Sequence, residues 1–120
     1  MADRLLFISW GQTVRGAEDR SIEVFNDAMG ILGRMQQDGR IESLDVVLLG
    51  ANSVLNGCML LHGTAAQIAA LSEDEEFRRV TVDASMIVDD LNVMPGFVNE
   101  GVGPQMALFA EAAAKVPQHA

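Results

Sequence analysis

The spacing of hydrophobic and polar positions along the chain predicts four β-strands. The run in Arg4–Trp10 is apolar with little interruption, which is typical of a strand buried on both faces. A second strand is predicted at Ile41–Leu49. Its Leu44, Val46 and Leu48 share one face, and the other face is mixed, with Ser43, Asp45, Val47 and Leu49. Two more strands are predicted at Cys58–His62 and Met86–Met94, and Pro95-Gly96 is expected to end the last one.

The same pattern predicts four helices. Apolar side chains recur at three- and four-residue steps in about Ala17–Gln37, and Gly39 is placed to end this helix. Two capping boxes, Thr64–Gln67 and Ser72–Glu75, predict the starts of two short helices. An alanine-rich stretch predicts a terminal helix at about Gln105–Lys115.

The order of these elements predicts the fold class. If the two short helices count as one helical layer, the chain reads β-α-β-β-α-β followed by a tail helix. Right-handed crossovers turn this order into a four-stranded antiparallel sheet with both main helices on one face. We therefore expect a ferredoxin-like α+β domain over residues 1–100 and a C-terminal tail helix over residues 101–120.

Composition narrows the classes of partner. The 120 residues are 49% hydrophobic and carry a net charge of −9, so the chain can bury a core but would be repelled by nucleic acids and anionic membranes. No apolar run approaches the length of a membrane span, and the N-terminus lacks the pattern of a secretory signal. A single cysteine, Cys58, favours a reducing, cytoplasmic location.

Three segments resemble a group of small uncharacterised bacterial proteins in the dimeric α+β barrel superfamily. These segments are Gly57–Ala65, Asp74–Phe77 and Ile87–Phe97. The superfamily includes YCII-like, EthD-like and antibiotic-biosynthesis monooxygenase-like branches. The resemblance implies a ferredoxin-like fold and a homodimer, and it implies no particular reaction.

The residues that carry chemistry in the named branches are not matched here. YCII-like proteins are proposed to use a histidine on the first helix, where this chain has none. The haem-degrading branch uses an asparagine, a tryptophan and a histidine, but Asn92, Trp10 and His62 do not follow its chain order. Neither activity is therefore transferred, and the sequence leaves open whether the chain is an enzyme.

His62 and Asp45 are the candidate catalytic pair. A hairpin that pairs the two residues would place them on the same sheet face, where the aspartate could orient the histidine as a general base. The alternative is a strand-end histidine bonded to a neighbour, and a one-residue slip in register would separate the pair.

Further polar residues are predicted on that same sheet face, away from the helices. They can line a ligand cavity, or they can form a wet surface or a hydrogen-bonded dimer interface. Trp10 is predicted on the helix side, as core or as the wall of a pocket. The candidate ligand-binding residues are Ser9, Ser43, Asp90, Asn92 and Trp10.

No metal site and no resident cofactor are expected. Asp89 and Asp90 point to opposite sides of the predicted strand, and no third carboxylate lies at a fitting spacing. Two functions therefore stay open: a small-molecule binding protein or enzyme, and a non-catalytic dimerisation or interaction module.

An apolar patch on the open face predicts a homodimer. Left bare, this patch would be larger than a soluble monomer usually exposes. The tail helix offers a second way to cover it, either by folding back on its own chain or by reaching across to a partner. The patch residues are Phe7, Val47, Leu49, Leu60 and Val88, and the apolar residues of the tail are Met106, Leu108 and Phe109.

Overall fold

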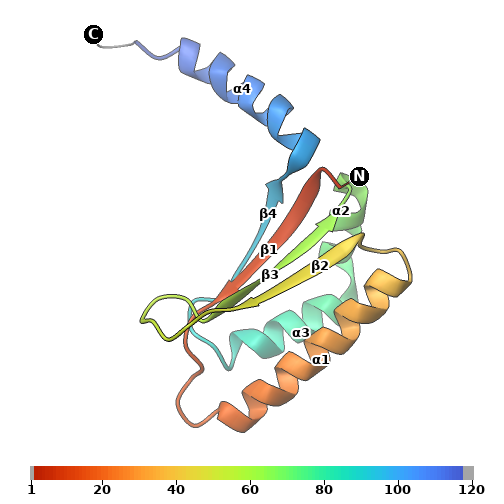
Figure 1. Cartoon of the computed structure of the whole chain (residues 1–120), viewed down its shortest axis with the longest axis vertical. Helices are drawn as coiled ribbons and strands as arrows, with labels where there is room; N and C mark the ends of the chain where they lie inside the picture. Colours follow the sequence, from red (N-terminus) through yellow and green to blue (C-terminus); the bar gives the residue numbers. More distant parts are fainter. Residues whose placement is uncertain (1, 118–120) are drawn as a thin grey trace.

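The computed structural model describes residues 2–117 and contains one four-stranded antiparallel sheet. The strand order is β2-β3-β1-β4, with both β2 and β4 at edges (Figure 1). This arrangement confirms the predicted ferredoxin-like α+β fold. The strands are β1 (Arg4–Trp10), β2 (Ser43–Leu48), β3 (Gly57–Gly63) and β4 (Asn92–Phe97).

Three helices lie on one side of the sheet, and a fourth projects from the body (Figure 1). The long helix α1 ends two residues before Gly39, whose φ of 75° is the left-handed conformation that favours glycine at a helix end. A single 3₁₀ turn, η1, leads into the projecting helix. The bounds are α1 (Glu18–Gln37), α2 (Ala65–Glu73), α3 (Glu75–Ser85), η1 (Asn99–Gly101) and α4 (Val102–Ala114).

The core lies between the sheet and the helices. Side chains of β1 and β3 that point towards the helices meet the apolar face of α1. A smaller cluster of Val24, Val80 and Ile87 joins α1, α3 and the segment that follows α3. The most deeply buried side chains are Leu6, Leu32, Met35, Ile41 and Leu61.

The fourth strand begins later than predicted. Residues 86–91 form turns and one isolated bridge between Thr13 and Val88, and β4 starts at Asn92. Ile87 is buried in the helix-side cluster, which draws this segment away from the sheet. The apolar pattern of residues 86–91 therefore reflects packing against helices and not a strand. Pro95 lies inside β4 and does not end it, because an edge strand tolerates a missing N–H.

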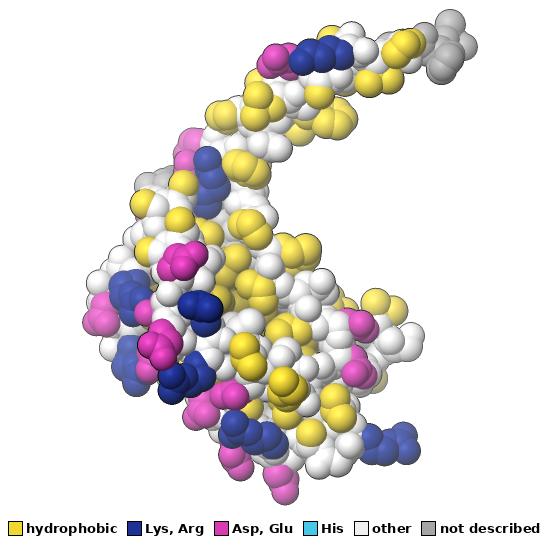
Figure 2. All heavy atoms as spheres, turned by 180° about the vertical axis from the view of Figure 1, so that it is seen from behind, with side chains coloured by type: hydrophobic (Ala, Val, Ile, Leu, Met, Phe, Trp, Pro, Cys, Tyr) yellow, Lys and Arg dark blue, Asp and Glu magenta, His cyan; other side chains and the backbone are white. Residues whose placement is uncertain are grey.

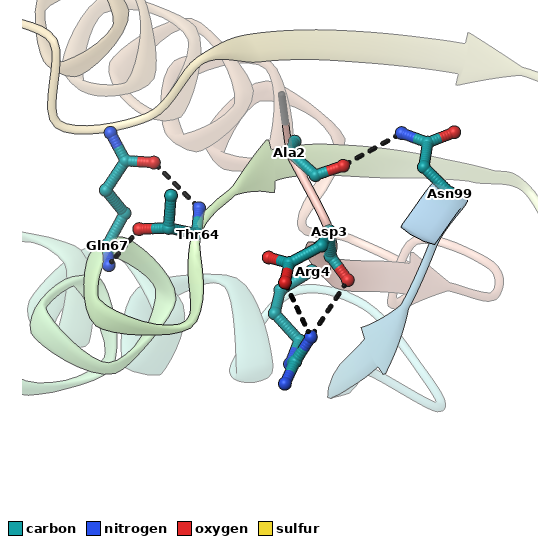
Figure 3. Close-up of polar contacts among 6 residues, drawn as sticks. All are labelled: Ala2, Asp3, Arg4, Thr64, Gln67 and Asn99. Carbon is teal, nitrogen blue, oxygen red and sulfur yellow. Dashed lines mark hydrogen bonds and ion pairs between the residues drawn. The ribbon is translucent and has the colours of Figure 1, made fainter. Parts of the chain in front are cut away.

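Two helix starts were predicted, and one of them is wrong in detail. The Thr64–Gln67 capping box is confirmed, with hydrogen bonds of 2.8 and 3.2 Å between the two residues (Figure 3). Ser72 does not cap α3. It lies within α2, where its hydroxyl donates to the Ile68 carbonyl, and Asp74 caps α3 instead.

Asp74 joins the start of α3 to the loop after α1. Its Oδ2 accepts the Phe77 backbone N–H at 2.8 Å, and its Oδ1 accepts from the Arg40 guanidinium at 2.6 Å. The hydrogen bond from Arg40, followed by that from Phe77, lowers the pKa of Asp74 below its ordinary value. The carboxylate is therefore both a helix cap and one half of an ion pair.

We expect Asp74→Ala to lower the free energy of unfolding by about 1–2 kcal/mol, because both the cap and the ion pair are lost. Since the folded pKa is lowered, this contribution is present above the unfolded pKa and disappears as pH falls through the folded one. Urea unfolding at about pH 7 and about pH 3 should show the difference between wild type and variant shrinking in acid.

Glu75→Ala is the matched control, because Glu75 pairs with Arg79 at 2.6 Å but both side chains are more than 70% exposed. We expect it to cost less than about 0.5 kcal/mol. Equal losses at neutral pH in the two variants would contradict the role given to Asp74.

Candidate functional site

The face of the sheet that points away from α1, α2 and α3 carries most of the candidate site residues. Strand alternation gives this open face a mixed character, with an apolar middle and polar residues near two ends. In Figure 2 the hollow between the projecting helix and the body is lined by white and yellow atoms. The open face consists of Leu5, Phe7, Ser9, Ser43, Asp45, Val47, Cys58, Leu60, His62, Asn92 and Met94.

His62 and Asp45 are in contact on this face. The His62 Nε2 lies 3.1 Å from the Asp45 Oδ2. The strand register differs from the predicted one by two residues, because Ser43 is opposite His62 and Asp45 is opposite Leu60. A two-residue shift leaves every side chain on its predicted face, so the pair meets as diagonal neighbours.

The pair has the geometry of an oriented histidine. If the Nε2–H donates to Asp45, the Nδ1 lone pair of the neutral ring is left to accept a proton. The imidazole is mostly covered, with 18% of its side chain exposed, whereas Asp45 is 65% exposed. An aspartate so open to water holds its partner only weakly.

Ser9 and Asn92 lie far from this pair. Ser9 is opposite both Cys58 and Asn92, whereas His62 is opposite Leu5, four positions earlier in β1. Four residues of a strand span roughly 13 Å. The Asn92 amide donates to the Asp90 carbonyl at 3.0 Å, within the turn before β4. The predicted polar residues therefore form two separate groups and not one site.

Asp90 and Trp10 are not on the open face. Asp90 lies in the turn before β4 with a φ of 54°, so its predicted place in a strand is wrong. Trp10 lies on the helix side, as predicted, and its indole meets the Phe25 ring edge-on at 6.5 Å between centroids. The sheet therefore separates Trp10 from the other candidate ligand residues.

The corrected position of Val88 changes the predicted apolar patch. Val88 packs against the Val24, Val80 and Ile87 cluster and so faces the helices. Leu49 follows the end of β2 and is 43% exposed. The remaining patch residues, Phe7, Val47 and Leu60, lie on the open face.

A cavity of about 90 Å³ lies on the helix side, between the sheet, α1 and α3. A single water needs only about 10–15 Å³ of such space, so the cavity has room for a small organic molecule. Its walls include Trp10, Phe25 and Phe77, and two alanines, Ala28 and Ala84, leave space opposite them.

The cavity has few polar groups. Its lining contains no Asp, Glu, Lys, Arg or His among the described residues, and its two hydroxyls belong to Ser21 and Thr81. The Thr81 Oγ1 donates to the Phe77 carbonyl at 2.8 Å, so its oxygen has acceptor lone pairs left. The Ser21 Oγ lies 3.4 Å from the Thr13 Oγ1. Such walls suit an uncharged ligand.

Sequence reasoning singled out only Trp10 from this cavity. The other walls come from α1, α3 and the segment before β4, which the fold brings together. The signal present in the sequence is a small residue at a core-facing helix position, such as Ala28, where the neighbouring positions are large.

A larger hollow runs along the outer surface of α1 and α3. It is an open groove of about 740 Å³, and four of its six charged side chains pair with one another. Arg34 lies 3.1 Å from Glu76, and Arg79 lies 2.6 Å from Glu75. Because these four charges are paired within the chain, the groove has the character of a solvated helix surface.

Residues 2–117 offer neither a metal cluster nor a membrane span. Within this range, no three His, Cys, Asp or Glu side chains come together in a way that could hold a metal ion. None of the helices described there is long and apolar enough to cross a membrane.

Comparison with known proteins shows the fold and no family. No family model matches the chain, and no curated protein matches it. Among solved structures, it is similar to a dimeric ferredoxin-like protein of unknown function from Bacteroides fragilis, with a TM-score of 0.60 at 8% identity over 79% of this chain and 96% of that one.

Two further structures give the same result. A dimeric ferredoxin-like protein of unknown function from Jannaschia sp. has a TM-score of 0.59 at 15% identity, over 79% of this chain and 99% of that one. The hydroxynitrile lyase of Passiflora edulis has a TM-score of 0.62 at 10% identity, over 83% of this chain and 97% of that one. Identities this low establish the ferredoxin-like fold alone.

We expect Gly57→Ala to disturb the wall of the cavity. Gly57 is paired with Trp10 across the sheet, and an added Cβ would lie 2.7 Å from the indole Cζ2 and 2.6 Å from the Val47 carbonyl. The free energy of unfolding should fall by about 1–3 kcal/mol, and the emission of Trp10, the only tryptophan, should shift.

Gly30→Ala in the exposed part of α1 is the control, since an added Cβ there meets nothing within 4 Å. It should raise stability by up to about 1 kcal/mol and leave the emission unchanged. Tolerance of Gly57→Ala without either effect would show that the indole is not held against Gly57.

Proposed function

We propose that this protein binds a small, uncharged, largely apolar organic molecule in the cavity between the sheet and helices α1 and α3, and that it does so as a homodimer. The observation that carries the proposal is the cavity itself, with its aromatic walls and its two hydroxyls. A site with apolar walls and a few polar groups is the usual form of a small-molecule site.

Protein cores are close-packed, and a space of about 90 Å³ between the sheet and the helices is larger than the gaps that such packing usually leaves. The space is partly open to solvent, so a small molecule can reach it from outside.

Thr81 supports a preference among uncharged ligands. Its hydroxyl proton is committed to the Phe77 carbonyl, so towards the cavity its oxygen acts as an acceptor. A ligand with one hydroxyl or amine donor and an apolar body fits this arrangement. The hydroxynitrile lyase neighbour supports the proposal only by showing that this fold hosts chemistry on a small molecule.

Homodimer formation rests on a different observation. On the open face, Val47 is 37% exposed and Met94 is 47% exposed, beside the half-buried Phe7 and Leu60. Two of the similar structures are described as dimeric, which supports the same assembly here. The resemblance to the dimeric α+β barrel superfamily is part of this proposal only as support for a homodimer. The three similar structures are not described as YCII-like or EthD-like. The single Cys58 supports a cytoplasmic setting.

A second candidate function is acid–base chemistry on the open face, with His62 as general base and Asp45 as the residue that orients it. The 3.1 Å contact favours it. This pair is on the opposite side of the sheet from the cavity, so it would act on a different ligand. With p-nitrophenyl acetate as substrate, His62→Gln should remove catalysis above background, and Asp45→Asn should lower it roughly tenfold or more.

We expect toluene to bind the cavity and to change the fluorescence of Trp10 in a saturable manner. The chain has one tryptophan and no tyrosine, so the signal reports on the cavity wall alone. Ala84→Leu should fill the space, weaken binding at least about tenfold, and leave stability equal or higher.

Ala69→Leu is the matched control, because Ala69 is exposed on α2 and does not line the cavity. It should bind toluene as the wild type does. Unchanged toluene binding in Ala84→Leu, with the fold intact, would rule out the cavity as the ligand site.

A further inference from the structure

Helix α4 projects from the body with no buried residue among its 13 positions (Figure 1). The radius of gyration is 17.0 Å, compared with about 13.5 Å for a compact chain of this length. Figure 2 shows the molecule as a crescent, with a hollow between the projecting helix and the rest of the chain. A helix of this length surrounded by water is only marginally stable, so α4 needs a surface to pack on.

One side of α4 is apolar. Val102, Met106 and Phe109 follow one another at four- and three-residue steps and are 43%, 55% and 65% exposed. At about 100° per residue they share a stripe, and Glu111, the one charged residue within Val102–Ala114, lies about opposite. Leu108, 60% exposed, and several alanines lie outside this stripe, so α4 is apolar over most of its surface and the stripe holds three of its four largest apolar side chains.

The root of α4 is held in place by the first residues of the chain. The Asn99 amide donates to the Ala2 carbonyl at 2.9 Å (Figure 3), and the Val98 N–H donates to the Asp3 carbonyl at 3.2 Å. Gly101 packs so closely on the Asp3 carbonyl that a Cβ would not fit. These contacts fix residues 98–101, and α4 leaves them pointing away from its own sheet (Figure 1).

The open face of the sheet matches α4 in length and chemistry. A 13-residue helix is about 20 Å long, and strands of six or seven residues span about 20–23 Å. The middle of the open face is apolar, with Phe7, Val47, Leu60 and Met94. The two apolar surfaces belong to one chain but are not in contact within it.

We propose that α4 is exchanged between two copies of this chain, so that the stripe of Val102, Met106 and Phe109 packs on the open sheet face of the partner. The two crescents interlock, and each projecting helix enters the hollow of the other. This inference rests on the homodimer of the proposed function and says which segment holds it together. It is independent of the ligand cavity.

The area of such a contact is sufficient for a stable dimer. A helix about 20 Å long and 10 Å wide has a lateral surface of roughly 600 Å². If half of it is covered, the two helices and the surfaces that receive them together lose roughly 1,200 Å². This is the lower limit for stable protein interfaces.

Light scattering on the full chain tests whether α4 makes the dimer. Wild type should have twice the chain mass of 12.9 kDa, and Met106→Glu and Phe109→Glu should raise the dissociation constant at least about tenfold. Ala107→Glu adds the same charge to the same helix away from the stripe, and it should remain a dimer. A monomeric wild type would overturn both the homodimer and the exchange, whereas a dimer insensitive to all three changes would overturn the exchange alone.

Cross-linking tests where α4 lies. Cys58 is the only cysteine and lies on the open face, so a chain with Cys58→Ser and Ala110→Cys can be mixed with wild type and treated with a short bis-maleimide. Exchange predicts a link between the two kinds of chain. Links between wild-type chains through Cys58 would instead show that the sheets pack face to face. A dimer with neither kind of link would show that α4 does not lie on the partner's sheet. Either result overturns the proposal.

Discussion

A four-stranded sheet has two faces, and the helices α1, α2 and α3 cover only one of them. This constraint governs the rest of the molecule. The covered face contains the core and the cavity, whereas the other face must be exposed to water or covered by additional chain. Among the described residues, α4 is the helix that packs on neither face of its own sheet, and the residues before it are held by Ala2 and Asp3.

The same two faces divide the chemistry. Trp10 and the two hydroxyls of the cavity are on the helix side, and the His62–Asp45 pair is on the open side. A backbone layer separates them, so no single small ligand can contact both. Ligand binding and acid–base chemistry are therefore alternatives at different places, and assembly through the open face affects the second far more directly than the first.

Much of this fold could be predicted because the spacing of apolar residues, and the sheet face to which each strand residue points, depend only on neighbouring residues. The bounds of β1 were predicted from its apolar run, and the two-residue error in the register of β2 and β3 kept Asp45 beside His62, since faces repeat every second residue. The segment before β4 was misread because Ile87 and Val88 are apolar for a tertiary reason, their packing against helices. The cavity could not be predicted because its walls come from several elements, and the residue pattern of any one element does not show how they pack together.

The attachment of α4 to Ala2 and Asp3 has a practical consequence for producing the protein. Ala2 and Asp3 bind the residues just before α4, so whatever is fused ahead of Ala2 lies beside the attachment of the projecting helix. An affinity tag at the N-terminus would lie close to the contacts of Ala2 and Asp3 with Asn99 and Val98. A tag at the C-terminus would extend the projecting helix α4. Either tag could change the position of α4 and so the oligomeric state that is measured. A cleavable tag that leaves few residues behind avoids this.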